Sequence, residues 1–140
     1  MILALTAGAA LAHSGVKNPA VQARMNAMMD IAGATKVLGN MAKGTVPFDA
    51  AAAREAAAQI ADKAAQVPTL FAAPETDPKS EAAPAIWQDF ATFTAQARQM
   101  ETAASAAAAQ IAAPEDLRAG LAAIGATCAS CHKAYRITGN

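Results

Sequence analysis

Apolar side chains recur every three or four residues between positions 19 and 44, which is the spacing of one face of an α-helix. Asn18 suits the N-cap of this helix, because its side chain can accept hydrogen bonds from free backbone N–H groups, and Pro19 suits the first helical position. Gly44 ends the pattern. The stripe runs through Val21, Met25, Met28, Ile31, Ala32, Thr35, Leu38 and Ala42.

A second helix is predicted at about residues 50–66, capped by Asp49 and with an apolar stripe made mostly of alanine. The connection that follows, from Pro68 to Pro84, contains four prolines and is rich in turn-forming residues. It separates the first pair of helices from the second pair.

The third helix is predicted at about residues 80–111, with Pro84 in its first turn and Trp87 on its apolar face. A fourth helix opens at Pro114, where acidic residues favour the positive end of a helix, and continues almost to the C-terminus. Four helices with two short connections and one long one predict an all-α fold, an antiparallel four-helix bundle. The abundance of alanine agrees with this class.

The charge balance excludes some partners. The chain has 11 basic and 11 acidic residues and a formal net charge of zero, so nothing suggests binding to nucleic acid or to an anionic membrane surface. After the first residues no apolar stretch reaches the roughly 18 residues of a membrane span. No acid/base pair or nucleophile is apparent, so we do not expect an enzyme.

Residues 1–12 resemble the apolar part of a secretory signal peptide, and Ala10-Leu11-Ala12 has the form of a cleavage site. A buried N-terminal helix is the alternative. Cleavage would make His13 the first residue of a single mature domain, 13–140, exported to the bacterial periplasm.

The strongest chemical motif is Cys128-Ala129-Ser130-Cys131-His132. C-x-x-C-H is the spacing at which a haem is attached covalently, because on a helix the two thiols and the imidazole share one face. Each thiol can bond one porphyrin vinyl group while the histidine reaches the iron. These are the only two cysteines of the chain.

Three other interpretations of the motif compete. A thioredoxin-like dithiol usually follows a strand, and no strand pattern precedes Cys128. A zinc site needs a second pair of ligands, and the only other histidine is His13. The third is an accidental C-x-x-C in a secreted protein. Covalent attachment of one haem c, near the C-terminal helix, is the favoured prediction.

The order and spacing of several further motifs resemble the cytochrome c-prime family of four-helix-bundle haem proteins. The resemblance covers about residues 16–138. It rests on Arg24-x-x-x-Met28, Leu38-Gly39, Lys43-Gly44, Pro47-Phe48-Asp49, Leu70-Phe71, Ile86-Trp87 and Cys128-x-x-Cys131-His132-x-x-Tyr135-Arg136.

The resemblance implies roles for individual residues. Met28 matches the position that faces the distal side of the haem, where a low-spin branch of the family has a ligating methionine. It implies a His132/Met28 haem, with Met25 and then Met29 as substitutes. Arg24 matches a position near the haem propionates, and a solvated surface charge is its alternative. Trp87 is expected to wall the haem or the core.

The leading functional prediction is an exported one-electron carrier that serves redox partner proteins. A five-coordinate haem protein that binds NO or CO is the alternative, and a haem-free helical thiol protein is the third. The cations Arg118, Lys133 and Arg136 follow the last acidic residue, Asp116, and could make the haem edge mildly basic, which would guide docking to an acidic partner. An ordinary solvated surface is the favoured alternative. Some family members pair through their first two helices, so a homodimer is possible here.

Overall fold

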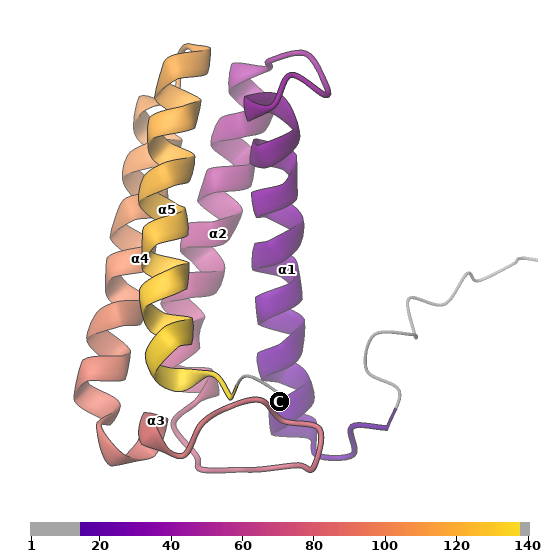
Figure 1. Cartoon of the computed structure of the whole chain (residues 1–140), viewed down its shortest axis with the longest axis vertical. Coiled ribbons are helices and arrows are strands. Elements are labelled where there is room, and N and C mark those ends of the chain that lie inside the picture. Colours follow the sequence, from indigo (N-terminus) through magenta and orange to yellow (C-terminus); the bar gives the residue numbers. More distant parts are fainter. Residues whose placement is uncertain (1–14, 138–140) are drawn as a thin grey trace, which may run out of the picture.

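The computed structural model describes residues 15–137. Five helices follow one another in this part of the chain: α1 (Pro19–Ala42), α2 (Ala50–Leu70), α3 (Ala85–Gln88), α4 (Phe90–Gln110) and α5 (Pro114–Tyr135). The four long helices run antiparallel as a bundle, and α3 is a single turn at its lower end (Figure 1). The predicted four-helix bundle is confirmed. The predicted signal peptide, 1–12, and His13 lie outside the described residues.

The helix starts follow the predicted caps. The Asn18 side chain accepts hydrogen bonds from the N–H groups of Ala20 and Val21, at 2.9 and 3.1 Å. The Asp49 carboxylate accepts one from Ala52 N–H at 3.0 Å. Local chemistry therefore fixes where α1 and α2 begin.

The predicted third helix, 80–111, is wrong at its start. Residues 80–84 are not helical, and the helix is broken at Asp89, whose φ is −137° and ψ is 58°. The Asp89 carboxylate instead caps α4 by accepting a hydrogen bond from Thr92 N–H. The segment before Pro84 pairs with the end of α5, since Ala83 N–H donates to the Tyr135 carbonyl at 2.9 Å. Long-range pairing here replaces the local helix.

The second helix is longer than predicted, because it continues through Pro68 to Leu70. Proline has no N–H group, so Pro68 cannot donate to the Ala64 carbonyl, and only two helical residues follow it. Val67 is buried beside it and holds this end of α2 in the core. The connector between α2 and α3 is accordingly shorter, residues 71–84.

The core divides into two clusters along the bundle axis. The upper cluster is aliphatic, with Leu38, Ile60 and Ile124 fully buried. The lower cluster is largely aromatic and centres on Phe93, whose ring lies 5.1 Å from that of Phe71 and 5.3 Å from that of Tyr135. A partly open space lies between these clusters and the surface.

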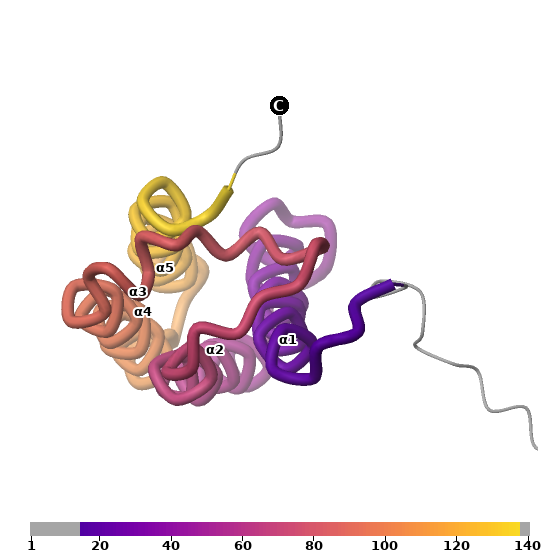
Figure 2. Tube along the Cα trace, turned by 90° about the horizontal axis from the view of Figure 1, so that it is seen from below, coloured from indigo at the N-terminus to yellow at the C-terminus, as the bar shows by residue number. Residues whose placement is uncertain are grey.

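Helices α4 and α5 approach closely at Gly120, where an added Cβ would lie 2.9 Å from the Cβ of Ala107. At Gly125, by contrast, nothing lies within 4 Å of such a Cβ. Helices α2 and α4 contact each other most extensively, whereas α1 and α5 make few contacts with each other. The connector 71–84 runs from α2 toward α1, turns, and returns past α5 across the lower end of the bundle (Figure 2). No helix within residues 15–137 is long and apolar enough to cross a membrane.

Candidate functional site

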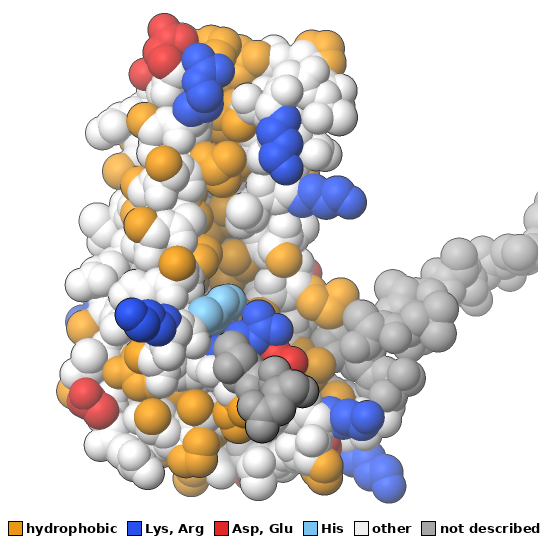
Figure 3. Space-filling model, viewed as in Figure 1, with side chains coloured by type: hydrophobic (Ala, Val, Ile, Leu, Met, Phe, Trp, Pro, Cys, Tyr) orange, Lys and Arg blue, Asp and Glu red, His pale blue; other side chains and the backbone are white. Residues whose placement is uncertain are grey.

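A groove of about 960 Å³ opens between α1 and α5. This volume is in the range of pockets that hold cofactor-sized ligands, about 300–1,000 Å³. Its surface is a strip of apolar side chains that runs along the bundle, with His132 beside it (Figure 3). Both core clusters contribute to its floor, through Ile31 from the upper cluster and Phe93 from the lower one.

Cys128, Cys131 and His132 line this groove from consecutive turns of α5. Both thiols are half-buried. Cys128 packs on the upper cluster and Cys131 on the lower one, so the pair spans the junction between them. The Cys128 Sγ atom lies 4.0 Å from the sulfur of Met100 on α4. The predicted motif therefore faces an apolar cavity, as covalent attachment of a flat apolar ring requires.

The surroundings keep these three groups uncharged. Burial raises the pKa of the Cys128 thiol, and burial together with the neighbouring Cys128 raises that of Cys131. Burial, and then the charge of Arg136, lowers the pKa of His132. A neutral imidazole is the form that binds a metal ion.

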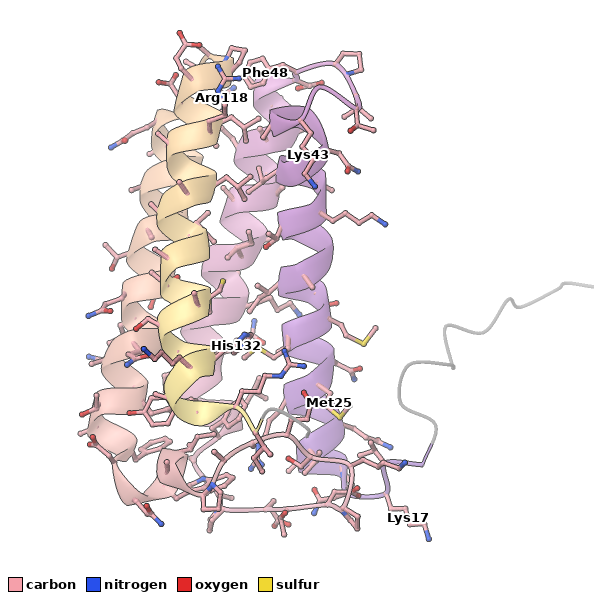
Figure 4. All side chains as sticks on the ribbon, viewed as in Figure 1. Lys17, Met25, Lys43, Phe48, Arg118 and His132 are labelled. Carbon is pink, nitrogen blue, oxygen red and sulfur yellow. The ribbon has the colours of Figure 1, made fainter. Side chains whose placement is uncertain are left out.

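Three methionines of α1 line the opposite wall: Met25, Met28 and Met29. Met29 is 48% exposed, whereas Met28 packs against both core clusters. Figure 4 shows Met25 nearer the lower end of the bundle than His132. Because α1 rises from that end, Met28, about 4.5 Å further along the axis, comes closer to the level of His132.

Arg24 also lines the groove, yet the residue is only 3% exposed. It donates hydrogen bonds to the backbone carbonyls of Leu70, Ala73 and Glu75, two of them at 2.9 and 2.7 Å. The group also lies over the rings of Phe71 and Trp87, with its carbon 4.9 and 5.3 Å from the ring centroids.

These contacts rule out a solvated surface charge for Arg24, because the residue is 3% exposed and its guanidinium donates to three backbone carbonyls. Burial lowers its pKa against the opposing effect of Glu75. The guanidinium remains charged, since its pKa is far above neutrality. Three of its five N–H donors are used by the carbonyls of Leu70, Ala73 and Glu75, so two donors are left over.

Trp87 does not line the groove. Its indole N–H donates to the Phe71 carbonyl at 2.7 Å, and its ring belongs to the lower cluster. Of the two predicted positions for Trp87, the haem wall and the core, the structure places it in the core below the cavity.

A profile described as Cytochrome C' matches residues 19–136 of this chain. The chain belongs to the cytochrome c' family. It is 38% identical over 121 residues to cytochrome c-556 of Agrobacterium fabrum, covering 84% of this chain and 80% of that protein.

Solved structures of the cytochrome c' family have the same fold. Cytochrome c' from Rhodopseudomonas palustris superposes with a TM-score of 0.82 at 30% identity, covering 89% of this chain and all of that one. Oxidized R. palustris cytochrome c556 gives a TM-score of 0.80 at 29% identity with the same coverage. The fold is therefore common to proteins of both names.

Family members bind covalently attached haem c, and the residues present here fit that group. Two thiols at the attachment spacing and one histidine lie on the wall of an apolar groove, with thioethers across from them. This cytochrome c' family chain accordingly carries haem c.

Sequence reasoning missed the connector residues Lys79, Ser80, Glu81 and Ala82, which close the lower end of the groove. The Glu81 carboxylate accepts a hydrogen bond from Arg136 Nε at 2.6 Å and forms an ion pair with the same guanidinium. Arg136, one of the cations that could have made the haem edge basic, is therefore paired with a carboxylate. No sequence signal pointed to this pair, because residue 81 was predicted to be helical.

Proposed function

We propose that this cytochrome c' family protein is a one-electron carrier whose haem c is attached to Cys128 and Cys131 and ligated by His132 and Met28. The haem, when bound, supplies the reversible Fe(III)/Fe(II) couple. The observation that carries the proposal is the position of Met28, which lines the groove opposite the histidine and packs against both core clusters.

The protein's own residues would keep the site nearly unchanged during electron transfer. Cys128 and Cys131 lie in the C-terminal half of a regular helix, so they would hold an attached ring at a fixed orientation. Met28 is equally fixed on α1, and its thioether raises the reduction potential relative to a second histidine. The apolar groove limits the access of water to the metal. Because the site would keep both ligands in both oxidation states, the structural reorganisation that accompanies electron transfer would be small.

Relatives named cytochrome c-556 support the low-spin, methionine-ligated branch for this chain. In place of Met28, Met25 would have to act from nearer the lower end of the bundle, and Met29 from an exposed position. Arg24, from its buried position one turn earlier on α1, would offer its two remaining donors to a haem propionate.

Optical spectra of the exported holoprotein test the proposal. The wild-type ferric and ferrous forms should be low-spin, with a weak sulfur-to-iron charge-transfer band in the far red and slow or absent CO binding. Met28→Ala should turn the spectrum high-spin and open the iron to CO, whereas Met25→Ala and Met29→Ala, as matched controls, should leave it low-spin. A wild-type high-spin spectrum that shifts at once with CO would replace the electron carrier by the gas-binding alternative.

We further propose export to the bacterial periplasm and a homodimer through α1 and α2. Two large apolar side chains of α1, Met29 and Val37, are 48% and 42% exposed, which suits an interface. Sedimentation velocity should give a dimer for the wild type and a monomer for Val37→Glu. A monomeric wild type contradicts the pairing, and holoprotein that stays in the cytoplasmic fraction contradicts export.

A further inference from the structure

Although the net charge of the chain is zero, most of the charged side chains that line the groove are basic. Three lysines line its mouth and are exposed: Lys36 on α1, Lys43 at the end of α1 and Lys79 in the connector. We call these three lysines the basic rim. Among residues 15–137, Glu81 is the only carboxylate that lines the groove, and it forms an ion pair with Arg136.

Most of the acidic residues are engaged elsewhere in holding the fold together. Carboxylates cap helices, bind backbone N–H groups of the connector or form ion pairs. They are Asp49, Asp89 and Asp116 at helix starts, Asp77 and Glu75 at the N-terminus of α1, and Asp30 and Glu81 in the two ion pairs formed within residues 15–137.

The lysines of the basic rim, by contrast, take part in neither of those two ion pairs. Figure 4 shows two more cations at the ends of the same face, Lys17 at the lower end and Arg118 opposite Lys43 at the upper end. Basic side chains accordingly surround the apolar strip in Figure 3. The two propionates of a haem would offset only part of this charge.

We propose that the basic rim docks an acidic surface of the redox partner protein over the groove between α1 and α5. This inference rests on the proposed electron-carrier function, because docking here places the partner next to the haem. Unpaired cations around an apolar depression attract a negative surface at long range and leave the contact itself apolar. The partner is identified by this chemistry, an acidic patch beside its own redox group.

The rates of electron exchange with an anionic and a cationic reagent, compared with each other, report the local charge at this face. The ferrous holoprotein is oxidised in a stopped-flow instrument by ferricyanide, an anion, and by tris(phenanthroline)cobalt(III), a cation, over a range of ionic strength. Ferricyanide should react faster at low salt and the cobalt complex slower. Reversing one rim charge about 10 Å from the trianion should slow ferricyanide about fivefold at 0.1 M ionic strength and less than twofold at about 0.5 M.

The variants are Lys36→Glu and Lys79→Glu, with Arg98→Glu as the matched control. Arg98 is exposed on α4 and does not line the groove, yet its reversal changes the net charge by the same amount. The two rim variants should slow ferricyanide and also slow reduction of the ferric protein by flavodoxin hydroquinone, a small acidic carrier. Arg98→Glu should leave both rates close to wild type.

Several results would overturn the inference. Equal effects of all three reversals would mean that only net charge matters, and equal rates with both small reagents would mean that the face is neutral. Salt-dependent binding to phosphatidylglycerol vesicles that Lys36→Glu abolishes, with unchanged rates to flavodoxin, would replace the acidic protein by a membrane. If neither reagent oxidises the ferrous protein, the electron-carrier function itself fails, which is a separate outcome.

Discussion

Replacing Arg24 by alanine should destabilise the protein by about 3 kcal/mol. Arg24 donates hydrogen bonds to the carbonyls of Leu70 at the end of α2 and of Ala73 and Glu75 in the connector, and bonds from charged donors contribute about 1.5–3 kcal/mol each. We discount the sum, because Ala73 and Glu75 lie in an exposed segment where water can replace the lost donor. Against a typical domain stability of 5–15 kcal/mol, the loss is large.

Urea unfolding of the holoprotein, followed by circular dichroism, gives the free energy directly. Arg24→Lys keeps the charge but not the planar fork, so it should lose about half as much. Arg98→Ala, at an exposed arginine on α4, should change stability by about 0.5 kcal/mol or less. Hydrogen exchange of residues 71–77 should accelerate in Arg24→Ala. A loss of stability below about 1 kcal/mol, with unchanged hydrogen exchange, would refute the conclusion that Arg24 holds the connector in place.

Three further predictions follow from single contacts. Gly120→Ala should lose about 1–3 kcal/mol in urea unfolding, because the new methyl group meets a neighbouring alanine on α4. Trp87→Phe should lose about 1 kcal/mol through its hydrogen bond yet leave the haem spectrum unchanged, whereas a spectral shift would place the indole on the haem wall. Hydrogen bonds from the backbone N–H groups of Lys79 and Lys17 lower the pKa of Asp77, so its contribution to stability is present above the unfolded pKa and is lost as pH falls through the lowered value. The stability gap between wild type and Asp77→Asn should therefore be constant near neutrality and close below about pH 4, and a gap independent of pH would contradict this assignment.

Helix positions were predictable where a cap and an apolar stripe agree. Asn18 and Asp49 each precede such a stripe, and both act as caps in the structure. The break at Asp89 was not predictable in the same way, because helical spacing continues on both sides of it. The turn α3 packs into the lower aromatic cluster, where Ile86 lies with Phe71 and Tyr135. These partners are far from Ile86 in the chain, so no local pattern predicts them.

The candidate site likewise contains some residues that local sequence patterns predict and others that they do not. Cys128, Cys131 and His132 form a local motif, so their shared helix face follows from spacing alone. Met28 was selected over its neighbours only by resemblance to the family, because spacing cannot tell which turn of α1 faces α5. The bonds of Arg24 span 46 to 51 residues, and no local pattern encodes such partners.

The connector 71–84 joins α1 and α5 across the lower end of the bundle. It is fixed to α1 by Arg24 and Asp77, and to α5 by the pairing of Ala83 with Tyr135 and of Glu81 with Arg136. Helices α1 and α5 touch each other little, although each packs against another helix of the bundle, so this strap across their lower ends is the main direct link between them. The metal ligands we propose lie one on each of these two helices. The distance between His132 and Met28 therefore depends on a polar segment that contains neither of them, and its loosening should weaken the methionine ligand first.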